Sequence, residues 1–96
     1  MRSRFQMGHL VATPGALRVL ESAGVLPLTL LNRHLSGDWG DLGPQDYAAN
    51  ERALTDGSRL LSAYSIPNNQ RIWIITEAQD DEGVRNSTCI LLPGEY

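Results

Sequence analysis

The apolar residues of this 96-residue chain change their spacing near Gly57. Before that point they recur every three or four residues, which is the period of an amphipathic helix. After it they form short runs rich in β-branched and aromatic residues, of which Arg71–Thr76 is the clearest. Proline and glycine mark the boundaries, because proline is tolerated in a first helical turn and glycine readily ends a helix. The sequence therefore predicts three helices, starting near Thr13-Pro14, Leu26-Pro27 and Pro44 and ending near Gly24, Gly37 and Gly57.

The strands are predicted at Leu60–Ile66, Arg71–Thr76 and Ser87–Pro93. Helices grouped before strands are typical of an α+β fold rather than a wound parallel sheet. We therefore predict three N-terminal helices followed by a three-stranded antiparallel β-meander, with Leu10–Ala12 as an optional N-terminal edge strand. A chain of this length forms one domain. We place its helical part at about 13–57 and its sheet part at about 59–93.

Charge and cysteine content exclude several classes of function. The chain has eight arginines, no lysine and eleven acidic residues, so its net charge is −3. This acidity argues against direct nucleic-acid binding. Cys89 is the only cysteine, so no internal disulfide is expected and a reducing compartment, the cytoplasm, is favoured. The longest apolar-rich stretch, Val25–Leu31, contains Pro27 and is far too short to span a membrane. We expect a cytoplasmic protein with no membrane partner.

Polar residues gather between Arg33 and Asn50, around Trp39 in a glycine-rich loop. One interpretation places them around a binding pocket with Trp39 as its wall or as an anchor for a partner. The alternative is structural: histidine suits the last turn of a helix, aspartate suits turns and first helical turns, and tryptophan can fill a small core. Asparagine is the least expected, because it is a poor residue for a helix interior. The binding candidates here are His34, Asp38, Trp39, Asp46 and Asn50.

Four carboxylates lie within six residues, at Glu77, Asp80, Asp81 and Glu82. Hard cations prefer oxygen ligands, but the spacing is not that of an EF-hand and an exposed acidic loop is usually solvated. We predict neither a metal nor a cofactor. Asp80, Asp81 and Glu82 are instead candidate binding residues that could mimic nucleic acid, as a negative patch in an Arg-lined groove that normally binds nucleic acid.

The common catalytic motifs, among them the P-loop, the dinucleotide-binding glycines and HExxH, are absent from the sequence. If the protein is an enzyme, the alternative is a small endoribonuclease of the barnase-like or RelE-like kind, an analogy that rests on the general layout of helices and strands. Its acid–base and phosphate-contacting groups would be His34, Glu77, Arg71 and Thr88.

Four stretches of the chain carry a resemblance: Met7–Leu17, Arg33–Gly40, Trp73–Ala78 and Leu91–Tyr96. Together they resemble a family of small bacterial proteins encoded on plasmids, integrative elements and prophages. The resemblance covers nearly the whole chain, and its most specific part is the string His-x-x-Gly-Asp-Trp-Gly. Family members usually follow the Thr-Glu-Ala string with a short turn to paired threonines, whereas this chain has a longer acidic loop and Cys89 in place of the second threonine.

The resemblance implies an accessory protein of a mobile genetic element. With the small size and net acidity, it favours a non-enzymatic binding protein that docks on a host or defence protein complex, as an inhibitor or regulator of the anti-restriction or anti-CRISPR type. A structural role is the third alternative, since a free sheet edge could pair two copies into a homodimer.

Overall fold

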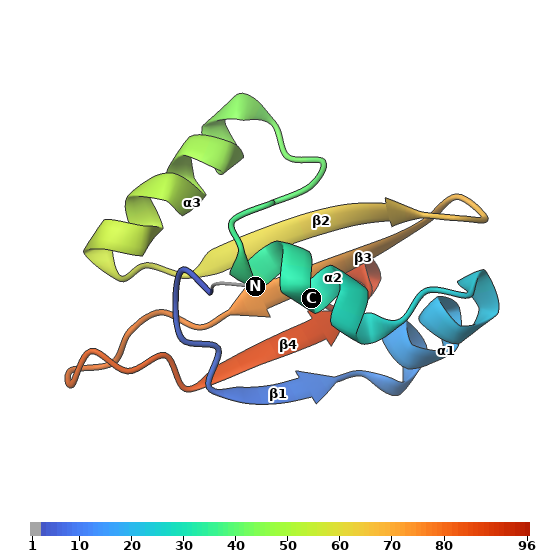
Figure 1. Cartoon of the computed structure of the whole chain (residues 1–96), viewed down its shortest axis with the longest axis horizontal. Coiled ribbons are helices and arrows are strands. Elements are labelled where there is room, and N and C mark those ends of the chain that lie inside the picture. Colours follow the sequence, from blue (N-terminus) through green and yellow to red (C-terminus); the bar gives the residue numbers. More distant parts are fainter. Residues whose placement is uncertain (1–2) are drawn as a thin grey trace.

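Four strands form one mixed sheet in the computed structural model, which describes residues 3–96 (Figure 1). The strand order is β1-β4-β3-β2. Strands β2, β3 and β4 pair antiparallel, whereas β1 pairs parallel with β4, His9 opposite Ser87 and Ala12 opposite Ile90. The strands are β1 (His9–Ala12), β2 (Leu60–Ile66), β3 (Gln70–Thr76) and β4 (Ser87–Leu91).

The predicted arrangement of helices followed by a three-stranded antiparallel meander is wrong. A strand, β1, precedes all three helices, and its parallel pairing with β4 makes the sheet four-stranded and mixed. The physical reason is that a parallel pair needs a long crossover, so its two strands lie far apart in the chain and share no local turn signal. The optional edge strand at Leu10–Ala12 does form, as β1, and it lies at the edge of the sheet beside β4.

The helices start and end close to the proline and glycine residues that were predicted to bound them. They are α1 (Pro14–Ala23), α2 (Pro27–Leu35) and α3 (Pro44–Asp56), each with proline in its first turn. Thr13 caps α1 by accepting a hydrogen bond from the amide of Ala16, and Gly24 ends it in the left-handed conformation, with φ 71°. Within residues 3–96, no helix has the length and apolar character needed to cross a membrane.

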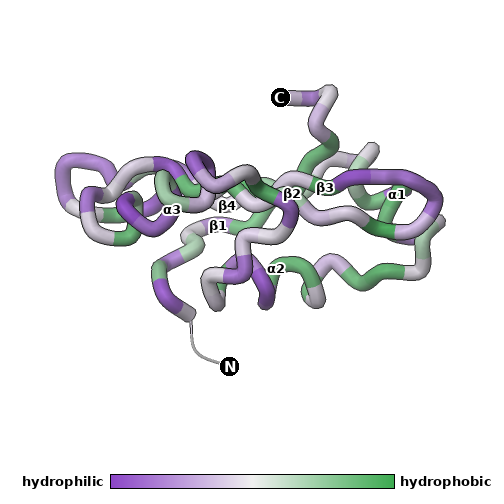
Figure 2. Tube along the Cα trace, turned by 90° about the horizontal axis from the view of Figure 1, so that it is seen from above, coloured by the Kyte–Doolittle hydropathy of each residue, from purple (hydrophilic) through white to green (hydrophobic). Residues whose placement is uncertain are grey.

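The helices do not cover both faces of the sheet. Helix α2 lies across one face, and the C-terminal end of the chain projects on the opposite side (Figure 2). Helix α1 joins α2 in the same core, whereas α3 lies beside the edge formed by β2 (Figure 1). We call the helix-covered side the inner face and the other side the outer face. The main core on the inner face contains Ala16, Leu20, Leu30, Tyr64, Ile66, Ile72, Ile74 and Ile90.

Candidate functional site

The Gly-Asp-Trp-Gly string closes the β2 edge of the sheet. Trp39 is fully buried in a second core with Ala53 and Leu60, so its ring offers no surface to a partner. Its indole nitrogen donates to Glu51 at 2.7 Å. The backbone on either side of Gly40 pairs with Ala63 as a short parallel bridge, with N–O distances of 3.1 and 2.7 Å.

His34 is buried inside the protein rather than in a pocket. Its Nδ1 lies 2.6 Å from the Ser62 hydroxyl and its Nε2 lies 2.9 Å from the Thr76 hydroxyl. Thr76 in turn contacts Thr88 at 2.7 Å, and Thr88 donates to the carbonyl of Met7 at 2.8 Å. This chain of contacts, which we call the His34 network, ties α2 to β2, β3, β4 and the N-terminal segment.

The carbonyl at the end of the His34 network sets the direction of every hydrogen bond in it. A carbonyl can only accept, so Thr88 donates to Met7 and accepts from Thr76. Thr76 must then accept from Nε2–H of His34, which leaves Nδ1 to accept from Ser62. The ring is therefore a neutral Nε2–H imidazole, and burial lowers its pKa to about 4.

The other predicted binding residues of this region do not converge on one pocket. Asp38 forms an exposed ion pair with Arg33 at 2.7 Å, and that hydrogen bond lowers the pKa of the Asp38 carboxyl. Asp46 is exposed in the first turn of α3, where negative charge favours the helix. Asn50 is buried and bonds the backbone of β2 through both ends of its amide.

The four residues named for the enzymatic alternative are not brought together. His34 and Thr88 are both fully buried in the His34 network. Arg71 and Glu77 are exposed near opposite ends of β3, roughly 20 Å apart at about 3.3 Å per residue.

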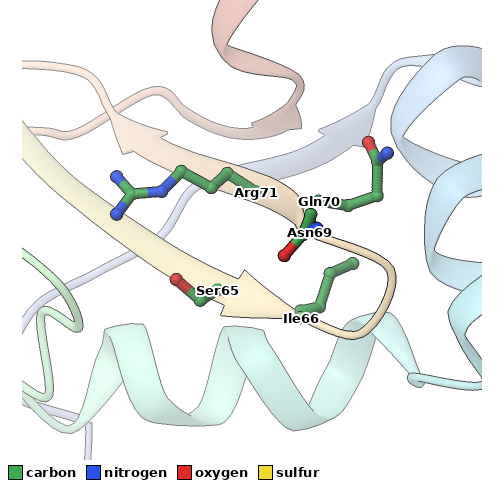
Figure 3. A pocket seen from close by; sticks show the side chains of 5 residues that line it. All are labelled: Ser65, Ile66, Asn69, Gln70 and Arg71. Carbon is green, nitrogen blue, oxygen red and sulfur yellow. The ribbon is translucent and has the colours of Figure 1, made fainter.

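Arg71 instead lines a hollow of about 180 Å³ at the tip of the β2–β3 hairpin. The side chains of Arg71 and Gln70 extend from β3 in different directions there (Figure 3). Polar hairpin residues make up most of the remaining lining, with Ser65 beside Arg71. Neither His34 nor a carboxylate contributes to this hollow.

The acidic loop is exposed, and one of its carboxylates is used by the loop itself. Asp80 accepts hydrogen bonds from the amides of Glu82 and Val84 and from the side chain of Asn86. These bonds lower the pKa of Asp80. Asp81 and Glu82 are exposed at the tip. Among residues 3–96, no group of three or more His, Cys, Asp or Glu side chains is placed to hold a metal ion.

Arg85, which the sequence analysis did not single out, is a buried arginine. Its guanidinium donates to the carbonyls of Ala53, Ser58 and Glu77 at 2.7–3.0 Å. It therefore satisfies carbonyls at the end of α3 and joins that helix to the loops beside β2 and β3. Burial lowers the pKa of Arg85, and the planar fork of donors explains why arginine fits here.

The outer face of the sheet is apolar although α1, α2 and α3 do not lie on it. The short 3-10 helix η1 (Pro93–Glu95), at the C-terminal end of the chain, contacts β3. Side chains alternate between faces along each strand, so the strand register gives the outer set directly. One row crosses all four strands, and a second crosses β2, β3 and β4. Val11 in the first row is 50% exposed and Trp73 in the second row is partly exposed, whereas Ile75, Ala63 and Leu91 are buried. The rows are Leu61–Ile75–Cys89–Val11 and Ala63–Trp73–Leu91.

Three side chains on the outer face, those of Arg59, Tyr96 and Trp73, pack in sequence with Tyr96 in the middle. Trp73 meets Tyr96 edge to face, with ring centroids 6.0 Å apart, and the Arg59 guanidinium lies 5.1 Å from the centre of the Tyr96 ring. Tyr96 is 66% exposed and Arg59 is exposed. We call this group the Arg59–Tyr96–Trp73 stack. Sequence reasoning missed it, although the apolar residues at both alternating positions of Arg71–Thr76 were a usable signal.

Comparison with protein-family models, with curated proteins and with solved structures finds no match. The resemblance to mobile-element proteins therefore stays a prediction.

Proposed function

We propose that this protein is a non-enzymatic binding protein whose outer sheet face docks on another protein. The observation that carries the proposal is the Arg59–Tyr96–Trp73 stack on the face that α1, α2 and α3 leave uncovered. Tryptophan, tyrosine and arginine are the residue types enriched at the energetic centres of protein interfaces. Here the Tyr96 ring contacts both Trp73 and Arg59, and these contacts reduce the side-chain entropy lost on binding.

The composition of the outer face supports the same proposal. An antiparallel sheet with one solvated face normally alternates apolar residues inside with polar residues outside. The outer rows here are apolar almost throughout, from Val11 on β1 to Leu61 on β2. Polar groups lie beyond them, with Ser65 and Arg71 facing each other at one end. An apolar centre with a polar rim is the usual anatomy of a protein interface.

The nature of the partner rests on the family resemblance and on the charge. We propose a host or defence protein complex in the cytoplasm, which the protein would inhibit or regulate as a mobile-element accessory factor. The exposed carboxylates of Asp81 and Glu82 would add a contact with a basic surface on that complex.

The test is an affinity capture from host lysate read by mass spectrometry, with two matched tyrosine variants as baits. Tyr96→Ala removes the middle of the stack, whereas Tyr47→Ala removes an exposed tyrosine, 46% accessible, from α3. We expect a specific partner to be lost with Tyr96→Ala and with Arg59→Ala and kept with Tyr47→Ala. Affinities of the purified partner should fall by about tenfold or more for a residue at the centre of an interface.

A second set of baits separates the outer face from the acidic loop. If the partner is kept by Tyr96→Ala and Arg59→Ala but lost when Asp81→Asn and Glu82→Gln are combined, the acidic loop is the contact surface and the outer-face proposal fails. Equal loss with Tyr47→Ala would also contradict it, because that variant leaves the outer face intact.

A further inference from the structure

The two edges of the sheet differ in how their backbone is protected. On β2, the amide of Asn50 bonds Leu61, and the backbone of Trp39 and Asp41 bonds Ala63. On β1, no segment of residues 3–96 lies beyond the strand (Figure 1). One edge is therefore sealed by the chain itself, and the other is left open.

The outward backbone groups of β1 belong to two residues. The amides of His9 and Thr13 donate to Asn86 and Ile90, so these residues point towards β4. Because successive residues of a strand alternate, Leu10 and Ala12 point their N–H and C=O groups away from the sheet. Both carry unused donors and acceptors at the edge.

From this edge we propose that two copies of the chain pair antiparallel through β1, joining their four-stranded sheets into one of eight strands. A two-fold axis at Val11 sets Leu10 opposite Ala12 of the second copy, and Ala12 opposite Leu10. Each of these pairs exchanges two hydrogen bonds, and Val11 faces Val11 of the second copy without a hydrogen bond.

The ends of β1 exclude the neighbouring two-fold registers. An axis at Leu10 would pair Ala12 with Gly8, which has φ +65° and is not extended. An axis at Ala12 would pair Leu10 with Pro14, which has no N–H and already begins α1. Only the register with the axis at Val11 lets both Leu10 and Ala12 form backbone hydrogen bonds with residues that belong to β1 of the second copy.

The side chains of β1 favour a second copy as the occupant. The strand His-Leu-Val-Ala carries no lysine, proline or acidic residue. These are the residues that usually prevent two sheet edges from pairing. Leu10 is 44% exposed, and among residues 3–96 five of the eight exposed large apolar residues lie between residues 10 and 28. Pairing at Val11 also joins the outer apolar rows of the two copies end to end, because Val11 ends the row on each. The docking of the outer face is a separate proposal, and neither depends on the other.

Sedimentation equilibrium from low micromolar to millimolar concentration tests the dimer. We expect the wild-type mass to rise from 10.6 kDa towards twice that value with concentration. Val11→Lys should stay monomeric, because it sets two like charges opposite each other. Tyr47→Lys, at a site of similar exposure on α3, should dimerise as the wild type does. Thermal melts of all three proteins verify that each is folded.

Cross-linking tests the register. In a Cys89→Ser background, Val11→Cys should form a disulfide-linked dimer under mild oxidation, whereas Leu10→Cys should not, since Leu10 faces Ala12. A wild type that is monomeric throughout, dimers of Val11→Lys, or equal cross-linking at both positions would each overturn the proposal. The capture experiment with Tyr96→Ala is read separately, so its failure leaves this result unaffected.

Discussion

The side-chain amide of Asn50 pairs with the backbone of Leu61 as a neighbouring strand would. Its Nδ2 donates to the Leu61 carbonyl at 2.5 Å, and its Oδ1 accepts from the Leu61 amide at 3.0 Å. A single residue of α3 thus seals part of the β2 edge, which explains an asparagine inside a helix.

Replacing Asn50 with alanine should destabilise the protein by about 2 kcal/mol, because the Leu61 backbone loses both partners. Urea unfolding measures the change. Asn32→Ala is the matched control, since Asn32 is exposed on α2 and alanine has the higher helix propensity. Equal effects of the two substitutions would show that the Asn50 contacts contribute nothing.

The stability of the protein should fall as the pH is lowered through the range in which free histidine titrates. The folded-state pKa of His34 is about 4, below the unfolded value of 6.5, so the unfolded state binds protons first. The contribution of this group is complete above pH 6.5 and is lost between pH 6.5 and 4, at a cost of roughly 3 kcal/mol.

Chemical denaturation at several pH values checks this expectation, with His34→Gln as the comparison. The difference in free energy of unfolding between the two proteins should be constant above pH 7 and shrink towards pH 4. Carboxylates contribute equally to both proteins and cancel in the difference. A difference independent of pH would show that His34 is not buried as the neutral imidazole.

Gly40→Ala should unfold the protein or destabilise it by about 3 kcal/mol or more. Gly40 has φ +77°, and a Cβ there would overlap the carbonyl oxygen of Ala63. Gly94→Ala is the control, because a Cβ at Gly94 meets nothing within 4 Å. Circular dichroism melts of both variants suffice, and a Gly40→Ala protein of wild-type stability would rule out the bridge to Ala63.

Arg85→Met should cost roughly 3 to 5 kcal/mol, because three backbone carbonyls lose a charged donor. Arg85→Lys should recover only part of this, since an ammonium cannot reproduce the planar fork. Urea unfolding again provides the measurement, with Arg52→Met on the exposed side of α3 as the neutral control. Full rescue by lysine would show that charge alone matters at this site.

Local patterns predicted the helices and the β2–β3 hairpin well because their signals are local. Thr13, Pro14 and Gly24 act on backbone groups a few residues away, and the turn before Gln70 joins adjacent strands. The parallel partner of β1 carries no such signal. A contact between residues near the two ends of a chain depends on everything folded between them.

The candidate site was harder to predict for a related reason. Histidine and tryptophan side chains such as His34 and Trp39 are common in binding pockets. The same side chains can also lie in a buried hydrogen-bond network or in a hydrophobic core. Whether such a residue lines a pocket or lies in the interior depends on which segments of the chain pack on it. For His34 these include β2, β3 and Phe5, whose ring meets the imidazole edge to face at 5.2 Å.

The sequence by itself determined the helix positions, the main antiparallel strands and the net acidity of this protein, because periodicity, caps and charge act within a few residues or simply add. Only the tertiary structure decided that His34, Trp39 and Asn50 are internal and that Val11, Trp73 and Tyr96 face outwards. The physical reason is that a strand has two faces and two edges. Which of them is covered depends on segments distant in the chain.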